Sequence, residues 1–259
     1  NSPRDAVSTP SWSLDSQQIT FADFHFEDEN VSIHTARFPG AKKDTRQKVS
    51  KSGDAKSDKA KSDEAKPGLA RLQYRFLHFG GPNTPRMIEP RFLEDAHRIL
   101  FVGEQSGFRH LHVLDTTYQT VSPLTSGNYE VYLTDISRDR RFALVTSTKT
   151  SPARTMAYRV DCKTGEMTAL TDQAGNYSSV AISQDGTKML ANYSTFGKLT
   201  ELVGVDSSAR KENFKVLTDS HSEEARKITR PIPEFFNYTN RMAQSLGMQP
   251  NEYYFESSL

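Results

Sequence analysis

The sequence predicts an all-β protein, a partial β-propeller of about four blades, each a four-stranded antiparallel sheet. Two observations predict this fold: a repeat of about 46 residues, and short apolar runs separated by turn residues within each copy. An aspartate at a strand end recurs 46 and 45 residues apart, and a Leu-Thr pair recurs 46 and 47 residues apart. These landmarks are Asp115, Asp161 and Asp206, and Leu124-Thr125, Leu170-Thr171 and Leu217-Thr218.

Each copy opens on a turn that is followed by an apolar run. The turns lie at 92–95, 136–139 and 182–185, and the apolar runs at 99–101, 142–145 and 189–191. Aspartate and glycine favour tight turns, through side-chain hydrogen bonds to the backbone and through positive φ. The unbroken apolar runs predict strands that are buried on both faces between neighbouring blades.

An earlier copy of the turn lies at 12–15, with an apolar run at 19–21. Asp15 and Asp95 are 80 residues apart, which exceeds one repeat, so an insertion must expand the first blade. We expect the other strands of this blade around 31–38 and 72–79. The predicted organisation is first-blade strands in 1–40, an insertion at 41–68, propeller blades at 69–219, and a linker helix with the start of another domain or a tail at 220–259.

The insertion has the composition of a disordered loop. Residues 41–66 contain nine Lys/Arg, five Asp/Glu and no aromatic residue, so they offer too little apolar surface to offset the entropy of ordering. An arm that binds a polyanion is the alternative, but it needs clustered positive charge that is not mixed with acids. The formal net charge of the whole chain is +1, which gives no reason to expect nucleic-acid binding.

Other bulk features exclude further classes of protein. Cys162 is the single cysteine, so neither an internal disulfide nor a cysteine-based metal cluster is expected. No apolar run reaches the length of a membrane span. The chain begins at Asn1 rather than methionine, so we expect it to be processed or partial, and a periplasmic, extracytoplasmic or cytoplasmic location stays open.

Five ordered motifs resemble the N-terminal propeller of the dipeptidyl peptidase IV family of serine peptidases. They are Trp-Ser-Leu-Asp at 12–15, Glu-Pro-Arg-Phe-Leu-Glu-Asp at 89–95, Glu-Gln-Ser-Gly-Phe-Arg-His-Leu at 104–111, Leu-Thr-Ser-Gly-Asn-Tyr-Glu-Val at 124–131 and Pro-Glu-Phe-Phe at 233–236. The last motif resembles the segment that leads from the family's propeller into its catalytic domain. Gln105 and Tyr129 depart from the family pattern, which has Arg or Asn and Trp there.

The resemblance implies that this is the non-catalytic propeller portion of a peptidase that releases N-terminal dipeptides from peptides. The family propeller has eight blades, and it walls off and gates an active site in a C-terminal α/β-hydrolase domain. No Gly-x-Ser-x-Gly nucleophile motif occurs in the chain, and 103–107 is a near miss that we interpret as a strand-to-turn segment. No catalytic residue, metal or cofactor is therefore assigned to this chain.

Two other functions stay open at this stage. One is a stand-alone propeller similar to TolB that binds a protein partner, and the other is an inactive relative of the peptidases. The resemblance also leaves open whether the parent forms a homodimer.

Five side chains are candidates for a site. Arg86 precedes 89–95 in the stretch where related propellers line the substrate cavity, so it is the candidate substrate-binding residue, with an exposed loop arginine as the alternative. His110 and His112 have a zinc-ligand spacing but no evident third ligand, so a structural role is expected. The adjacent acids Glu223 and Glu224 could hold an ammonium group, but we expect them on the surface of a short helix.

Overall fold

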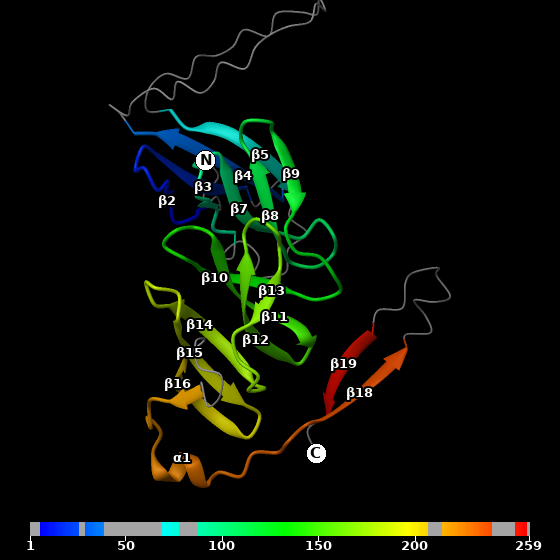
Figure 1. Ribbon diagram of the computed structural model, residues 1–259. Helices are drawn as coiled ribbons and strands as arrows, with labels where there is room; N and C mark the ends of the chain where they lie inside the picture. The colour runs from blue at the N-terminus through cyan, green and yellow to red at the C-terminus, as the bar shows by residue number, and fades with distance from the viewer. Residues whose placement is uncertain are drawn as a thin grey trace, which may run out of the picture. The chain divides into compact units, whose positions relative to one another are not determined.

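The computed structural model describes residues 6–25, 29–38, 69–77, 88–206, 214–239 and 252–257, and it confirms the predicted fold class. The described elements are antiparallel strands and one short helix (Figure 1). The strands form one five-stranded sheet, three four-stranded sheets and one two-stranded sheet. The chain divides into two compact units, residues 1–104 with 112–123, and residues 105–111 with 124–259.

The first unit contains the first blade and most of the second. The first blade consists of β1 (Ala6–Val7), β2 (Ser11–Trp12), β3 (Gln18–His25), β4 (Asn30–Arg37) and β5 (Arg71–Leu77), in the order β1-β3-β4-β5 with β2 also paired to β3. The second blade consists of β6 (Arg91–Phe92), β7 (Arg98–Gly103), β8 (His110–Asp115) and β9 (Thr120–Pro123), in sequence order. The strands expected around 31–38 and 72–79 are thus present as β4 and β5.

The second unit contains the third and fourth blades and the segment that follows them. The third blade consists of β10 (Val131–Ile136), β11 (Phe142–Ser151), β12 (Arg154–Asp161) and β13 (Met167–Ala169). The fourth consists of β14 (Asn176–Ile182), β15 (Lys188–Thr195), β16 (Lys198–Asp206) and β17 (Phe214–Val216). Helix α1 (Glu223–Lys227) follows, and β18 (Glu234–Thr239) pairs with β19 (Glu252–Ser257).

The repeated aspartates close turns, as their spacing predicts. Asp161 ends β12, and its Oδ1 accepts hydrogen bonds from the backbone N–H groups of Lys163 (2.8 Å) and Thr164 (2.9 Å). At the opening turn of the fourth blade, Ser183 Oγ donates to Asp185 Oδ1 at 2.6 Å. This bond, with those from Thr187, lowers the pKa of the Asp185 carboxyl to about 2. The landmarks are therefore local turn devices that each blade repeats.

Aromatic and aliphatic side chains pack the core of the first unit. Phe76 of β5 and Phe101 of β7 lie with ring centroids 5.5 Å apart, and Ile33 and Ile99 are fully buried beside them. Burying one such side chain contributes about 1.5–3 kcal/mol. The apolar runs of the repeat thus form the packed layer between the first and second blades.

One repeat position is covered differently in the fourth blade. Leu100, Leu144 and Leu190 each lie five residues after the aspartate of the opening turn. Leu100 and Leu144 are 0% exposed, whereas Leu190 is 46% exposed. In the third blade, β10, β11 and β12 all contact β14 of the fourth blade, which accounts for the burial of Leu144. Within the part of the chain that the structure describes, the face of the fourth blade that carries Leu190 has no equivalent cover.

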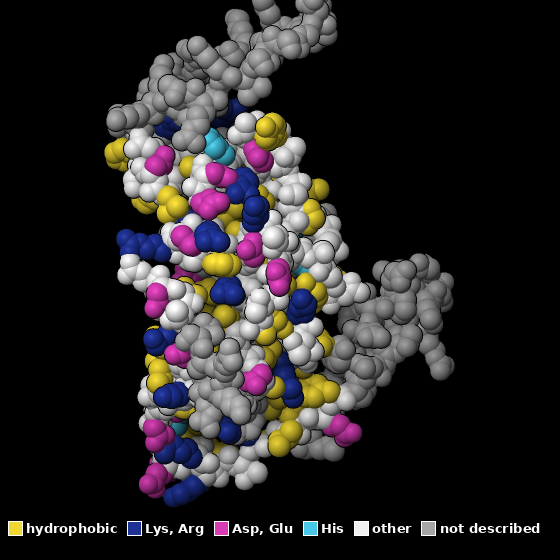
Figure 2. Space-filling view, in the orientation of Figure 1, with side chains coloured by type: hydrophobic (Ala, Val, Ile, Leu, Met, Phe, Trp, Pro, Cys, Tyr) yellow, Lys and Arg dark blue, Asp and Glu magenta, His cyan; other side chains and the backbone are white. Residues whose placement is uncertain are grey.

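The surface charge and the end of the chain complete the description of the fold. On the face shown in Figure 2, basic and acidic side chains are interspersed. The short helix expected after the blades is present as α1, and β18 begins at Glu234, within the Pro-Glu-Phe-Phe motif. The insertion at 41–68 lies outside the described residues, and the domain boundaries stay a prediction. The described residues include no helix long and apolar enough to cross a membrane.

We expect Tyr177 to make the stability of the second unit decrease in alkali. This residue of β14 is buried, its hydroxyl donates to the Gln173 carbonyl oxygen at 2.8 Å, and burial raises its pKa from 10.0 to about 12. Between those values the unfolded chain loses the phenolic proton and the folded chain keeps it, so stability falls as pH rises from 10 to about 12. Urea unfolding of the wild type and Tyr177→Phe across this window measures the effect. Equal slopes in the two proteins would contradict the prediction.

Candidate functional site

A polar contact recurs at the repeat period between the start of the third strand of one blade and the segment that enters the next. The Arg109 N–H donates to Glu130 Oε2 at 2.8 Å, and one repeat later the Thr155 N–H donates to Asn176 Oδ1 at 3.1 Å. In the third copy the side chain is the donor: His221 Nε2 donates to the Thr200 carbonyl oxygen at 2.7 Å. We call this contact the inter-blade tie. Its side-chain members are 46 and 45 residues apart, so the tie belongs to the repeat.

The motif histidine His110 supports the first of these ties from inside the core. It is 1% exposed, and its Nε2 donates to the Gly127 carbonyl oxygen at 2.8 Å. Its Nδ1 is then the acceptor for the Thr125 hydroxyl at 3.1 Å, and the same hydroxyl oxygen accepts the Leu111 N–H at 3.0 Å. The Tyr129 ring meets the imidazole edge to face, with centroids 5.2 Å apart. Both ring nitrogens are therefore used by the fold.

The second histidine of the pair also has a structural place. His112 is 6% exposed, and its ring stacks on Phe101 with centroids 5.5 Å apart. Across the described part of the chain, no three His, Cys, Asp or Glu side chains come together as metal ligands do. Cys162 is a buried free thiol.

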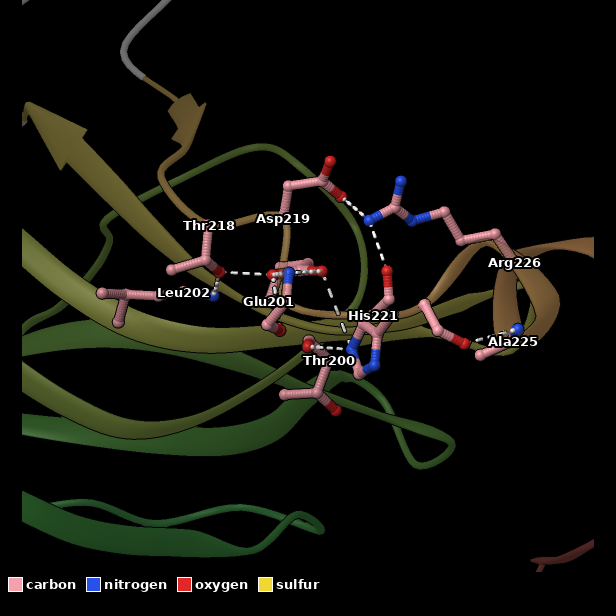
Figure 3. Close-up of polar contacts among 10 residues, drawn as sticks. Thr200, Glu201, Leu202, Thr218, Asp219, His221, Ala225 and Arg226 are labelled. Carbon is pink, nitrogen blue, oxygen red and sulfur yellow. Dashed lines mark hydrogen bonds and ion pairs between the residues drawn. The ribbon is translucent and has the colours of Figure 1, made fainter.

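Glu201 holds the end of the fourth blade together (Figure 3). It occupies the repeat position of His110, and its carboxylate accepts hydrogen bonds from the Thr218 hydroxyl and, at 3.1 Å each, from the Ser220 N–H and hydroxyl. The bond from Thr218 is the main cause of a lowered pKa for the Glu201 carboxyl. Thr218 Oγ1 also accepts the Leu202 N–H at 2.9 Å, as Thr125 does with Leu111. The threonine hydroxyl is thus bonded in the same way in both copies, with the Glu201 carboxylate as the acceptor in place of His110 Nδ1.

Helix α1 begins where the next blade would begin its first strand. β10 starts directly after Glu130 and β14 starts at Asn176, whereas α1 follows the equivalent His221. Ser222 caps the helix by accepting the Ala225 N–H at 3.3 Å, with acids in the first turn and basic residues in the last.

The helix is joined to the network by Arg226. Its guanidinium donates to the His221 carbonyl oxygen at 2.5 Å and forms an ion pair with Asp219 (Figure 3). Glu223 and Glu224 are exposed, as expected, and Glu223 pairs with Lys227 at 3.7 Å. The two acids therefore face solvent on a surface helix.

Serine, histidine and glutamate meet in this network, but their hydrogen bonds do not link a nucleophile to a base and that base to an acid. A nucleophilic hydroxyl must be hydrogen-bonded to a base that is oriented by an acid. Here the Ser220 hydroxyl donates to Glu201, and His221 Nε2 is directed to the Thr200 carbonyl oxygen, with Glu201 Oε1 3.7 Å away. The arrangement binds the chain after β17 to β16, and it does not activate a hydroxyl.

The other sequence candidates have clear outcomes. Arg86 lies outside the described residues, so its substrate-binding role stays a prediction. The near miss at 103–107 is the turn after β7, where the Ser106 hydroxyl donates to the Phe108 carbonyl oxygen at 3.2 Å. Glu201 and His221 were not anticipated, although both stand at repeat positions that the spacing of the landmarks defines.

Residues 80–199 match the family model of the dipeptidyl peptidase IV (DPP IV) N-terminal region. The matched stretch, 120 of the 259 residues, is similar to that region. It contains His110, Thr125 and Glu130, the motif residues that build the first inter-blade tie. The resemblance of the motifs at 89–95, 104–111 and 124–131 is thereby confirmed.

Solved structures share the fold at low identity. The chain is similar to puromycin hydrolase (TM-score 0.62, 12% identity, 91% of this chain and 32% of that chain). It is also similar to dipeptidyl peptidase 4 from Porphyromonas gingivalis (TM-score 0.62, 15% identity, 96% and 30%) and to TolB from Acinetobacter baumannii (TM-score 0.53, 16% identity, 93% and 50%). The chain thus spans about a third of the two hydrolases and half of TolB. None of the curated proteins is significantly similar to it in sequence.

Proposed function

We propose that the chain is the non-catalytic propeller portion of a dipeptidyl peptidase IV-like serine exopeptidase. In this proposal the blades wall off and gate an active site that lies in a C-terminal α/β-hydrolase domain. The whole enzyme releases N-terminal dipeptides from peptides by serine acyl transfer. The observation that carries the proposal is the family match over 80–199, together with the structural use of its motif residues.

The described chemistry supports a wall rather than a catalytic centre. The polar residues that meet in the second unit satisfy backbone groups, and the Ser220 hydroxyl donates to the Glu201 carboxylate, whose lowered pKa makes it a poor general base. A gate of this kind needs rigid blades, because an entry that excludes folded proteins must keep its width. The inter-blade ties and the buried His110 provide that rigidity.

The segment after the blades fits a junction to a following domain. Helix α1 ends at Lys227, Pro231 and Pro233 follow, and β18 begins at Glu234 within the Pro-Glu-Phe-Phe motif. The Phe235 ring packs on Phe196 of the turn between β15 and β16, with centroids 5.4 Å apart. We propose that this contact fixes the direction in which the chain leaves the fourth blade. Arg86 is proposed to contact the peptide substrate.

The reading frame downstream of Leu259 and the activity of its product test the proposal. We expect a Gly-x-Ser-x-Gly motif followed by Asp and His, and a whole protein that cleaves Gly-Pro and Ala-Pro reporter peptides and reacts with a fluorophosphonate probe. The 259-residue chain alone should do neither, because it lacks a nucleophile elbow. Cleavage that stays with the 259-residue chain through several different purification steps would contradict the proposal.

A second function is favoured by one observation, the similarity to TolB over 93% of this chain. In that case the chain is a protein-binding propeller, and a stop codon close after residue 259 would support it. An inactive relative of the peptidases is distinguished by the same experiment. It would have the downstream domain but would lack the serine, the aspartate or the histidine.

A further inference from the structure

A pocket of about 510 Å³ lies in the second unit, between the opening turns of the third and fourth blades. Its lining includes Arg138, Phe142 and Arg159 from the third blade and Ile182 from the fourth. This volume is in the range of pockets that bind small organic ligands, roughly 300–1,000 Å³. The lining combines an apolar floor with guanidinium groups.

Two guanidinium groups lie near the Phe142 ring, and one of them, that of Arg159, belongs to the lining of the pocket. The Arg159 guanidinium lies 4.7 Å from the centroid of the Phe142 ring, and that of Arg141 lies 5.7 Å from it. Among the described residues, neither Arg138 nor Arg159 has a carboxylate partner. A guanidinium held on an aromatic face keeps its N–H fork available for a carboxylate. The lining therefore presents two guanidinium groups that form no ion pair within the described residues.

Two carboxylates limit the charge that the pocket accepts. Asp139 and Asp185 line it, and each is held in its own turn by a serine hydroxyl, Ser137 at 2.7 Å and Ser183 at 2.6 Å. Hydrogen bonding lowers the pKa of both carboxyls, so both are ionised at neutral pH. The two guanidiniums of the lining against these two carboxylates leave it close to neutral. A near-neutral lining can take one carboxylate between its arginines and opposes a polyphosphate.

The repeat shows that blade packing does not require this set of residues. The repeat position of Phe142 is occupied by Arg98 in the second blade and by Lys188 in the fourth. The repeat position of Arg159 is occupied by Val113 in the second blade and by Gly204 in the fourth. Arg98 forms an ion pair with Asp95 of its own turn. At these two repeat positions, the third blade alone among these three combines an aromatic residue with an arginine, so the pair is not a structural element of the repeat.

We propose that this pocket binds the carboxylate end of a small apolar monoanion, such as the C-terminal residue of a short peptide with a hydrophobic side chain. Arg138 and Arg159 bind the carboxylate, and Phe142 and Ile182 contact the apolar body. The inference does not depend on the proposed peptidase function, because it uses only side chains of the second unit.

Titration of the full 259-residue chain with N-acetyl-phenylalanine and with its uncharged amide tests the pocket. We expect saturable binding of the acid in the millimolar range and binding of the amide about tenfold weaker or more. Arg159→Gln should weaken the acid about tenfold, because it removes the charge and keeps most of the length. Arg154→Gln, on the exposed end of the same strand β12, is the matched control and should bind as the wild type does.

Several outcomes would overturn the proposal. They are no saturable binding of the acid up to about 10 mM by a wild-type chain with a normal circular-dichroism spectrum, equal affinity for acid and amide, or equal losses in the two arginine variants. Tighter binding of pyrophosphate than of the monoacid would also contradict it, since the two aspartates should repel a polyanion.

Discussion

Gly165→Ala is expected to destabilise the second unit by about 3–5 kcal/mol, among the largest effects of a single methyl group. Gly165 lies in the turn between β12 and β13 with φ at +76°, a conformation that alanine adopts at a cost. A Cβ at this position would lie 2.0 Å from the Leu124 carbonyl oxygen, which is backbone and cannot rotate away. The turn or the segment entering the third blade must therefore shift.

Gly186→Ala is the matched control for this prediction. Gly186 has a similar φ of +73°, but its added Cβ would meet no atom within 4 Å. The variant should lose only the conformational term, about 1–2 kcal/mol. Urea unfolding followed by far-ultraviolet circular dichroism, with hydrogen exchange of the β12 amides, compares the two. If both variants lose the same stability, the clash with Leu124 is not what limits this turn.

His110→Ala is expected to cost the second unit about 2–4 kcal/mol. The substitution opens a cavity at a residue that is 1% exposed, and it leaves the Gly127 carbonyl without the Nε2 donor 2.8 Å away. His221→Ala is the control. That histidine also contacts a backbone carbonyl, at 2.7 Å, but it is partly exposed, so water replaces the lost partner and the cost should stay below about 1 kcal/mol.

A variant at Thr125 distinguishes the free-energy cost of the cavity from the cost of the lost hydrogen bonds. Thr125→Val removes the oxygen that contacts both His110 Nδ1 and the Leu111 N–H and keeps the shape of the side chain. A double-mutant cycle with His110→Ala should give a coupling energy of about 0.5–3 kcal/mol. Strictly additive losses would mean that His110 acts by filling space alone.

The fold could be predicted because its landmarks act locally. Asp115 and Asp161 bond to N–H groups two and three residues later, so the spacing of these residues alone indicates the turns and hence the strands between them. The apolar runs around Ile99 and Leu144 gave the buried strands for the same reason, since burial on both faces requires an unbroken run.

The site could not be predicted to the same extent, because its contacts join residues far apart in sequence. Glu130, Asn176 and His221 fill one repeat position with three different side chains, and what they share is a backbone partner. Only the period could have aligned them. The pair of Phe142 and Arg159 was also missed, because it depends on the register between β11 and β12 and leaves no sequence motif. Arg86, which a family resemblance suggested, lies outside the described residues.

The inter-blade tie has a consequence for the order in which the protein is made. Each tie links one blade to a residue at or just before the start of the following blade, as Thr155 is linked to Asn176 only 21 residues later. A ribosome adds roughly 5–20 residues per second, so the partner of a finished strand emerges within about 1–4 seconds. A new blade can thus be fastened to the nascent chain before the next one exists. The blades can therefore fold one after another during synthesis, and the edge strand of the newest blade stays unpaired for only a few seconds. A short exposure of this kind limits pairing with strands of other chains.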